Sequence, residues 1–244
     1  MLKTVAIIPA RLKSKRFPGK VLTNIAGKSL LRRTYDQVRQ CDMLSKIIIA
    51  ADDPTVMQHA QDFGAEVVMT DPSHPTGTHR VAAAVQQLAL DADIVVNVQA
   101  DEPCLDPNVL NVLVRHLYQH PEACITTPVS RIHDPEEALG PSCVKCVFDR
   151  QGRALYFSRA PIPYAQHERR VPYYRHLGVY CFRKQALLDF AAMTPTPLQQ
   201  TEDLEQLKIL EHGYPLHVCL VESSSAGVDT PEDVKKVEAL LCQI

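Results

Sequence analysis

The sequence predicts an α/β protein: a mainly parallel, twisted sheet flanked by helices, with a smaller β insertion. Apolar runs of strand length alternate with helical patterns through the first half of the chain, which is typical of parallel sheets. The 244 residues suffice for a full core, and a composition of 45% apolar and 22% charged residues is that of an ordinary globular protein.

Four strand patterns and four helix patterns alternate in the first 120 residues. We expect strands at 4–10, 46–52, 65–70 and 93–100, and helices at 29–41, 53–64, 79–90 and 107–120. Asp53, Pro54 and Gly64 are typical of an N-cap, a first helical residue and a helix end. Strands joined by helices pair in parallel, and such sheets bind ligands at the carboxyl ends of their strands.

The pattern changes between about 126 and 180, where we expect strands without long helices between them. These strands are at 143–149, 154–159 and 176–182, with a Pro- and Tyr-rich excursion at 160–175. We interpret the segment as a β insertion on the same core, so that 1–244 forms a single domain. A helix at 200–213, a strand at 216–222 and a closing helix at 230–244 complete the prediction.

The charge distribution argues against several classes of protein. The net charge is −2, whereas a general nucleic-acid binder is more often basic. No apolar run approaches the roughly 20 residues that span a bilayer, and residues 1–10 lack the layout of a signal peptide, so we expect no membrane insertion. Nine Lys or Arg residues nevertheless precede the first acidic residue, Asp36, which indicates local anion recognition.

The eight cysteines are scattered and mostly lie in apolar surroundings. We therefore expect reduced thiols, which suits a cytoplasmic protein. Cys143 and Cys146 have CxxC spacing, but there is no second such pair and they fall in an alternating strand pattern. Packed thiols are favoured over a zinc or redox site.

A cationic loop follows the first strand and contains Arg11, Lys13, Lys15, Arg16 and Lys20. It is not a Walker A loop, because Leu22 stands where that motif needs glycine, and it has no GxGxxG fingerprint. Arginine binds phosphate oxygens in a bidentate manner and lysine acts as a point charge. A solvated basic loop is the alternative; the position at the ligand edge of the sheet favours phosphate binding.

Two carboxylates are candidates for a divalent cation. Asp101 ends a buried strand, and Asp229 precedes a helix whose start Thr230 and Asp233 can cap without it. The alternatives are a turn-forming aspartate before Pro103 and a second capping acid. The two carboxylates, together with the cationic loop, suit Mg²⁺-nucleotide chemistry.

Other polar residues leave more than one interpretation open. The 76–80 loop, with Thr76, Gly77 and Arg80, either binds an anion or a base edge or simply caps a helix through Thr76 or Thr78. His176 is either a candidate base or, more often for a lone histidine in a strand, a satisfied core residue.

The motifs, taken in order, resemble the 3-deoxy-manno-octulosonate cytidylyltransferase family, the CMP-Kdo synthetases. The resemblance runs from about Thr4 to Leu241 and rests on "IIPARLKSKRFPGK", "NVQADEP", "ALYFSRAPIPY", "RHLGVYCFRK", "LEQLKILEHG" and "GVDTPEDV". It implies a nucleotide-diphospho-sugar-transferase-like fold and transfer of CMP from CTP to the anomeric 2-hydroxyl of Kdo, with release of pyrophosphate. It also implies Mg²⁺, a homodimer formed with the β insertion, and a role in lipopolysaccharide synthesis.

The resemblance also implies a role for each motif residue. By motif position, Arg11, Arg16 and Lys20 hold the triphosphate and, with Asp101, are the catalytic groups; Thr76, Gly77 and Arg80 hold cytidine; Gln99, Arg159, His176, Glu205 and Gln206 line the sugar pocket; Asp101 and Asp229 hold Mg²⁺. Arg159 is expected to face the sugar carboxylate.

The chain departs from the family pattern at three places. Ala100 stands for a glycine before the metal aspartate, Cys146 for a small or apolar residue, and His79 for a frequent acidic residue. None removes a proposed ligand. The rival functions are activation of another acid sugar, such as a sialic acid or an amino analogue of Kdo, and a catalytically silent nucleotide-binding protein.

Overall fold

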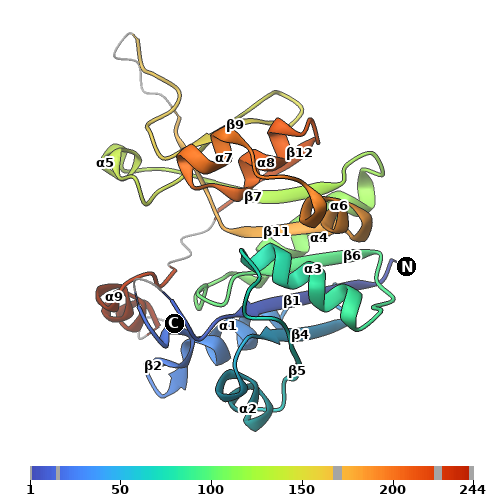
Figure 1. Cartoon of the computed structure of the whole chain (residues 1–244). Helices are drawn as coiled ribbons and strands as arrows, with labels where there is room; N and C mark the ends of the chain where they lie inside the picture. The colour runs from blue at the N-terminus through green and yellow to red at the C-terminus, as the bar shows by residue number, and fades with distance from the viewer. Residues whose placement is uncertain (1, 15–16, 167–171, 223–226, 242–244) are drawn as a thin grey trace.

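A ten-stranded sheet forms the centre of the molecule in the part of the chain that the structure describes (Figure 1). The structure is a computed structural model and describes residues 2–14, 17–166, 172–222 and 227–241. The strand order is β5 (Glu66–Met69), β4 (Lys46–Ala51), β1 (Thr4–Ala10), β6 (Ile94–Val98), β11 (Val179–Arg183), β7 (Ile125–Arg131), β10 (Tyr174–His176), β8 (Lys145–Phe148) and β9 (Ala154–Ser158), with β12 (Leu216–Val221) paired to β7.

The first four strands in this order pair in parallel, and their neighbours make the sheet mixed. β11 runs antiparallel to β6 and to β7, so β7 and its parallel partner β12 point the same way as β6. The carboxyl ends of β1, β6, β7 and β12 therefore meet at one edge of the sheet. The predicted fold class is confirmed.

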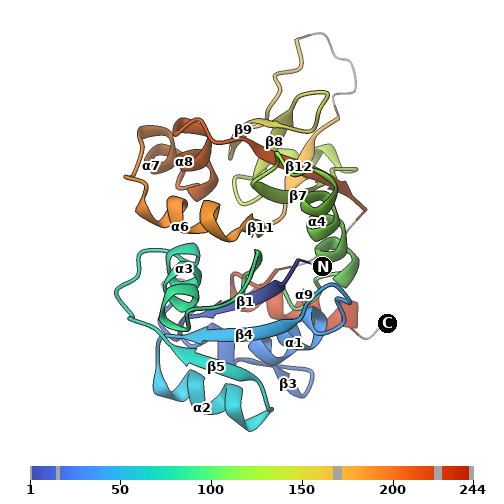
Figure 2. The same cartoon turned by 90° about the vertical axis from the view of Figure 1, so that its right-hand side faces the viewer.

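Helices cover both faces of the sheet (Figure 2). Ala6 and Ile8 of β1 face a core shared with α1 (Leu30–Val38), α2 (Pro54–Asp62) and α4 (Pro107–Gln119). Val5 and Ile7 face a second core with α3 (Gly77–Gln87), α6 (Lys184–Ala192) and α8 (Glu205–Glu211). Because successive strand residues point to opposite faces, a strand buried on both is nearly all apolar, as "TVAIIPA" is after Thr4.

The strands of the predicted insertion continue the main sheet and curl back onto it. β8 and β9 form a hairpin through residues 149–153, and an isolated bridge joins Arg153 to His217 of β12. The Val218 amide donates to the Gly152 carbonyl at 2.7 Å, which reinforces the bridge. A short helix, α5 (Pro135–Leu139), lies between β7 and β8. A dimerisation role for this segment stays a prediction.

The prediction of a single helix at 200–213 was wrong, because two helices meet there. α7 (Pro197–Glu202) ends at Asp203, whose φ of 52° is left-handed, and α8 starts at Glu205. Arg159 donates to the Glu202 and Asp203 carbonyls at 2.8 and 3.3 Å, so these carbonyls have a partner outside the helix. A distant side chain thus stabilises a break that helical periodicity does not reveal.

Another helix was not predicted at all. α6 (Lys184–Ala192) presents Ala186, Leu187 and Phe190 to the core, a helical spacing that was available in the sequence. Within the described residues, no helix has both the length and the apolar character needed to cross a membrane. The seven described cysteines are unpaired, among them Cys143 and the buried Cys146, as expected for packed thiols.

The last helix closes the ligand edge of the sheet from the side. α9 (Pro231–Leu241) packs Val237 and the preceding Val228 against Ile25 and Leu30. Ile25 belongs to a two-stranded ribbon of β2 (Asn24–Ile25) and β3 (Lys28–Ser29), which follows the 3₁₀ turn η1 (Lys20–Leu22). The cationic loop and the segment before α9 are therefore neighbours.

A fully buried lysine supports the insertion. Lys145 is 0% exposed, and its Nζ donates to the carbonyls of Gly140, Cys143 and Arg159 at 3.0, 2.7 and 2.5 Å. Burial lowers the pKa of its ammonium. The three carbonyls come from both sides of the β8–β9 hairpin, so one side chain fixes both.

We predict that Lys145→Met lowers the free energy of unfolding by about 2–3 kcal/mol, because buried carbonyls lose a charged donor while the volume is kept. Urea unfolding followed by circular dichroism measures this. Lys46→Met is the matched control, since Lys46 forms a half-exposed ion pair with Glu66 and such pairs contribute less than about 1 kcal/mol. Equal losses in both variants would contradict the structural role of Lys145.

Candidate active site

A cavity of about 490 Å³ opens at the carboxyl ends of β1 and β6. It is lined by Pro9, Arg11, Lys13, Ser14, Lys20, Val21, Pro75, Gly77, Gln99, Ala100 and Asp101. Basic side chains come from the loop after β1, and an acid comes from the loop after β6. The cavity thus lies where ligands of open α/β sheets bind.

The cationic loop turns back so that its basic side chains reach the cavity. Gly19 has a φ of 71° and its amide donates to the Leu12 carbonyl at 3.0 Å, which closes the loop. This left-handed conformation is one that glycine adopts without strain. Arg11 Nη2 donates to the His74 carbonyl at 2.9 Å, which links the loop to the segment before α3. Arg16, the third predicted triphosphate residue, lies outside the described residues.

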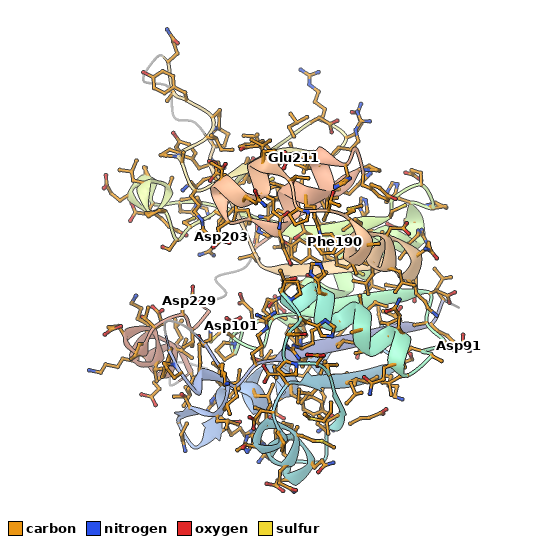
Figure 3. The ribbon with its side chains drawn as sticks, in the orientation of Figure 1. Asp91, Asp101, Phe190, Asp203, Glu211 and Asp229 are labelled. Carbon is orange, nitrogen blue, oxygen red and sulfur yellow. The ribbon has the colours of Figure 1, made fainter. Side chains whose placement is uncertain are left out.

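Lys20 joins the two predicted metal ligands. Its Nζ lies 2.5 Å from Asp101 Oδ2 and 3.5 Å from Asp229 Oδ1, although the residue is only 9% exposed. Figure 3 shows the two aspartates next to each other, with Asp229 just before α9. The structure therefore brings together Lys20, Asp101 and Asp229 at the mouth of the cavity.

The start of α9 is capped by a residue other than Asp229. Asp233 Oδ2 accepts from the amides of Asp229 and Thr230, at 3.1 and 3.0 Å, and from the Thr230 hydroxyl. This is the capping pair that the sequence indicates. The Val228 amide donates to the Asp101 carbonyl at 2.9 Å, which holds the segment before α9 against the end of β6.

The aspartate pair fits a hard divalent cation bound together with a ligand. Carboxylate oxygens are what Mg²⁺ prefers, and Asp101 and Asp229 already converge on one positive group, the Lys20 ammonium. Among the described residues, no group of three or more His, Cys, Asp or Glu side chains is arranged to hold a metal alone. Two carboxylates that need further oxygens from a phosphate match the usual way in which proteins bind Mg²⁺.

The 76–80 loop forms the second wall of the cavity. Thr76 caps α3 by accepting from the His79 amide, and Gly77 lines the cavity. A Cβ at Gly77 would lie 3.1 Å from Gln99 Oε1 and 3.2 Å from Pro9 Cγ. The glycine therefore lets the loop backbone pack closely against these two side chains. Arg80 is completely buried: Nη1 donates to Thr70 Oγ1 at 2.6 Å.

Arg80 also lies 3.6 Å from Asp52 Oδ2, and Asp52 Oδ1 accepts from the Leu12 amide of the cationic loop at 2.9 Å. The buried guanidinium therefore ties α3 to the loop through one carboxylate. A contact of Arg80 with cytidine stays a prediction.

Of the residues predicted to line a sugar pocket, Gln99 lines the cavity, whereas Arg159, His176, Glu205 and Gln206 are not among the residues that line it. Gln99 follows β6 and lines the cavity, and Glu205 Oε1 accepts from Thr78 Oγ1 at 2.5 Å. Gln206 Oε1 accepts from the Tyr180 hydroxyl at 3.1 Å, and its buried Nε2 has no hydrogen-bond partner among the described residues. Gln206 is buried and does not line the cavity, so its contact with a sugar stays a prediction.

Arg159 is engaged within the protein. Besides the carbonyls of Glu202 and Asp203, its guanidinium donates to the Pro141 carbonyl at 3.0 Å. Glu202 in turn accepts from the Ser158 hydroxyl and the Arg159 amide. The guanidinium thus fixes the segment after β9; a contact with a sugar carboxylate stays a prediction.

Burial determines the charge of His176. Its Nε2 is 2.8 Å from Thr127 Oγ1, and its ring packs edge-on against Phe157. Burial lowers its pKa to about 3, so the imidazole is neutral at physiological pH. Such a group is a weak base, and the packing favours a positioning role. Burial likewise raises the pKa of Glu205.

Sequence reasoning did not identify two buried polar residues as part of this site. Asn97 and Asp52 connect the predicted residues to one another, yet neither belongs to a motif that indicates catalysis. Asn97 could have been noticed as a polar residue within the apolar run "DIVVNVQA", where a buried amide needs partners. Asp52 carried no comparable signal, because it reads as the last residue of the strand expected at 46–52, next to the helix N-cap Asp53.

The chain matches the family model described as cytidylyltransferase over residues 5–223, which identifies a nucleotidyltransferase. It is 50% identical over 239 residues to the 3-deoxy-manno-octulosonate cytidylyltransferase of Chlamydia caviae, covering 98% of this chain and 94% of the relative. The mitochondrial relative from Arabidopsis thaliana is 43% identical over 242 residues, covering 98% and 83%.

Two solved structures extend the comparison. A CMP:2-keto-3-deoxy-manno-octonic acid synthetase complexed with CTP is 36% identical, with a TM-score of 0.94 and 99% coverage of both chains. A cytidylyltransferase from Leptospira borgpetersenii, at 15% identity and a TM-score of 0.67, shares the fold; 100% of this chain and 88% of that chain are covered. The chain belongs to the 3-deoxy-manno-octulosonate cytidylyltransferase family. The predicted resemblance and enzyme class are confirmed.

Two partly buried histidines, His79 and His176, predict a loss of stability in mild acid. Burial lowers the pKa of His176 to about 3 and that of His79 to about 4, below the ordinary value near 6.5. The unfolded chain therefore binds more protons between pH 6.5 and these values. The contribution of these neutral imidazoles to the free energy of unfolding is fully present above about pH 6.5. It decreases as the pH falls, by up to about 1.4 kcal/mol per pH unit for each histidine.

Urea unfolding between pH 7.5 and 4.5 measures this dependence. His176→Asn should flatten it, and His133→Gln, which changes an exposed histidine, should keep the wild-type slope. A wild-type slope in His176→Asn would show that this imidazole does not contribute.

Proposed function

We propose that this protein transfers CMP from CTP to the anomeric 2-hydroxyl of Kdo, forming CMP-Kdo and pyrophosphate and activating Kdo for lipopolysaccharide synthesis. The observation that carries the proposal is the joining of a cationic loop to the Lys20, Asp101 and Asp229 cluster at one cavity, in a chain of this family. The CTP of the solved relative supports the choice of nucleotide.

The triphosphate would bind along the loop after β1. Arg11, Lys13 and Lys20 line the cavity and supply long donors, with Arg16 as a further candidate by motif position. Arginine and lysine neutralise phosphate oxygens, and a partly enclosed site strengthens that interaction. The cytosine ring would lie against the 76–80 loop, where Gly77 permits close approach and Thr76 and Arg80 hold the backbone in place.

Asp101 and Asp229 would hold Mg²⁺ against the phosphates. When bound there, the ion would neutralise phosphate charge and orient the α-phosphate. The chain's contribution is to fix both carboxylates: the capping by Asp233 and the bond from Val228 to Asp101 set their positions. Lys20 would contribute positive charge to the phosphate oxygens during the reaction.

The sugar would occupy the side of the cavity near Gln99, with Arg159, His176, Glu205 and Gln206 around it. The 2-hydroxyl attacks the α-phosphorus in line and pyrophosphate leaves, without a covalent enzyme intermediate. Catalysis then depends on positioning and on stabilising the developing negative charge. A homodimer formed with the β insertion and a cytoplasmic location are further proposals that follow from family membership.

The first measurement is pyrophosphate release from CTP and Mg²⁺ with Kdo, an amino analogue of Kdo and a sialic acid. We expect release with Kdo and at least about tenfold less with the others. A site whose buried polar groups bond to a sugar hydroxyl strongly rejects a sugar that leaves those groups unpaired. Release with another sugar would contradict the proposed sugar preference and the roles proposed for the pocket residues around His176 and Glu205. Folded protein that binds CTP but releases no pyrophosphate would favour a nucleotide-binding role.

Asp101→Asn should reduce turnover by about 10³-fold or more while the protein stays folded, because one charged ligand of the proposed ion is lost. Steady-state kinetics at several Mg²⁺ concentrations and a circular dichroism spectrum measure both effects. Asp106→Asn is the matched control, since Asp106 caps α4, does not line the cavity and should leave turnover unchanged. Near-normal activity of Asp101→Asn would overturn the metal assignment.

A further inference from the structure

We propose that the buried residues Thr78 and Asn97 are positioning residues that orient the amide of Gln99. In this orientation Gln99 presents its carbonyl oxygen, an acceptor, to the cavity and so selects a hydroxyl group on the sugar that can donate a hydrogen bond. The proposal rests on the proposed function, because it concerns the sugar that the same cavity binds.

A chain of hydrogen bonds runs from α8 to the cavity. Thr78 Oγ1 donates to Glu205 Oε1 at 2.5 Å, Asn97 Nδ2 donates to Thr78 Oγ1 at 2.9 Å, and Gln99 Nε2 donates to Asn97 Oδ1 at 3.3 Å. Thr78 and Asn97 are both 0% exposed. They therefore have no surface on which a substrate could contact them, and any effect on it passes through Gln99 or Glu205, the two ends of this chain of hydrogen bonds.

The chemistry of the groups fixes the direction of this chain. A glutamate oxygen that carries no proton can only accept, so Thr78 uses its single hydroxyl proton on Glu205. Thr78 can then only accept from Asn97, which makes the Asn97 group that faces it an NH₂. The other end of the Asn97 amide is an oxygen, and it requires the NH₂ of Gln99.

A rotated Gln99 amide is disfavoured by the same argument. Its oxygen would face the Asn97 oxygen, which puts two acceptors in contact inside the protein. Rotating Asn97 as well would place its oxygen against Thr78, whose proton is already on Glu205. Only a proton on Glu205 Oε1 would allow the complete chain to reverse.

The free end of the Gln99 amide lies at the wall of the cavity. Gln99 and Gly77 both line it, and a Cβ at Gly77 would be 3.1 Å from Gln99 Oε1. A Cβ at Gly178 would lie 3.7 Å from Gln99 Cγ. The two glycines leave room for the amide on both sides, so hydrogen bonding rather than steric confinement determines its rotation. A partly buried acceptor at this position favours a ligand hydroxyl and disfavours groups that lack a proton.

The test compares Kdo with monodeoxyfluoro analogues of Kdo, in which fluorine replaces one hydroxyl and cannot donate. Pyrophosphate release with CTP gives kcat/KM for each sugar. For the wild-type enzyme we expect one analogue to lose about 100-fold. Thr78→Val keeps the volume of the side chain but removes its proton, and should reduce that discrimination to less than about tenfold. Thr78→Ser, which restores the hydroxyl, should restore the discrimination.

A merely structural role of Thr78 would lower kcat/KM for all the sugars by the same factor and leave their ratio unchanged, which would overturn the proposal. If Thr78→Val does not fold, Gln99→Met tests the same point, since it removes the acceptor while Thr78 and Asn97 remain. Retained discrimination in Gln99→Met would also overturn it. The KM for CTP should stay within about twofold in Thr78→Val.

Failure of the proposed function has a different signature. A wild-type enzyme that releases no pyrophosphate with Kdo itself would overturn the proposed function, and with it this inference. A wild-type enzyme that turns over Kdo but accepts every fluorinated analogue equally well would overturn the inference alone.

Discussion

The contact of one ammonium group with two carboxylates is the interaction on which the arrangement of the site depends. Asp101 follows β6, Asp229 precedes α9, and Lys20 belongs to the loop after β1, so three separate segments meet at one point. Two carboxylates held close together repel each other, and the repulsion grows where water is partly excluded. A positive charge between them offsets that cost. Another cation that bound between the two carboxylates would offset the same repulsion. Its binding would therefore be coupled to the position of the Lys20 ammonium.

Polar networks behind the cavity wall do the remaining positioning. Arg80 connects α3 to the cationic loop through Asp52, and Asn97 connects Gln99 to Glu205 through Thr78. These side chains lie within the sheet and its covering helices, where an unpaired group is costly. Each network therefore has a preferred direction and geometry. The polar side chains behind the cavity wall are therefore held in defined positions, although the mouth of the cavity is built from loops.

Much of the fold and part of the site could be predicted from the sequence because those features are local. Periodicity revealed the strands of the parallel half, and Thr230 with Asp233 indicated a helix start that leaves Asp229 for another task. The break at Asp203 escaped prediction because a guanidinium from a distant loop stabilises it. The orientation of Gln99 was equally out of reach, since it depends on residues that come together only in the folded sheet. Long-range contacts, not local propensity, decide such details.

The order of the strands has a consequence for how the molecule reaches this state. The pairs β1–β4 and β4–β5 join strands that are close in sequence, whereas β6, β11 and β12 pair with β1, β6 and β7, which lie much earlier in the chain. Contacts between segments remote in sequence close slowly, because the intervening chain loses more entropy. The site needs such remote contacts, because Lys20 meets Asp101 and Asp229 only once β6 has paired with β1 and α9 has packed against Ile25. The charged groups of the site therefore span most of the chain, and no fragment shorter than residues 20–229 contains all three of them.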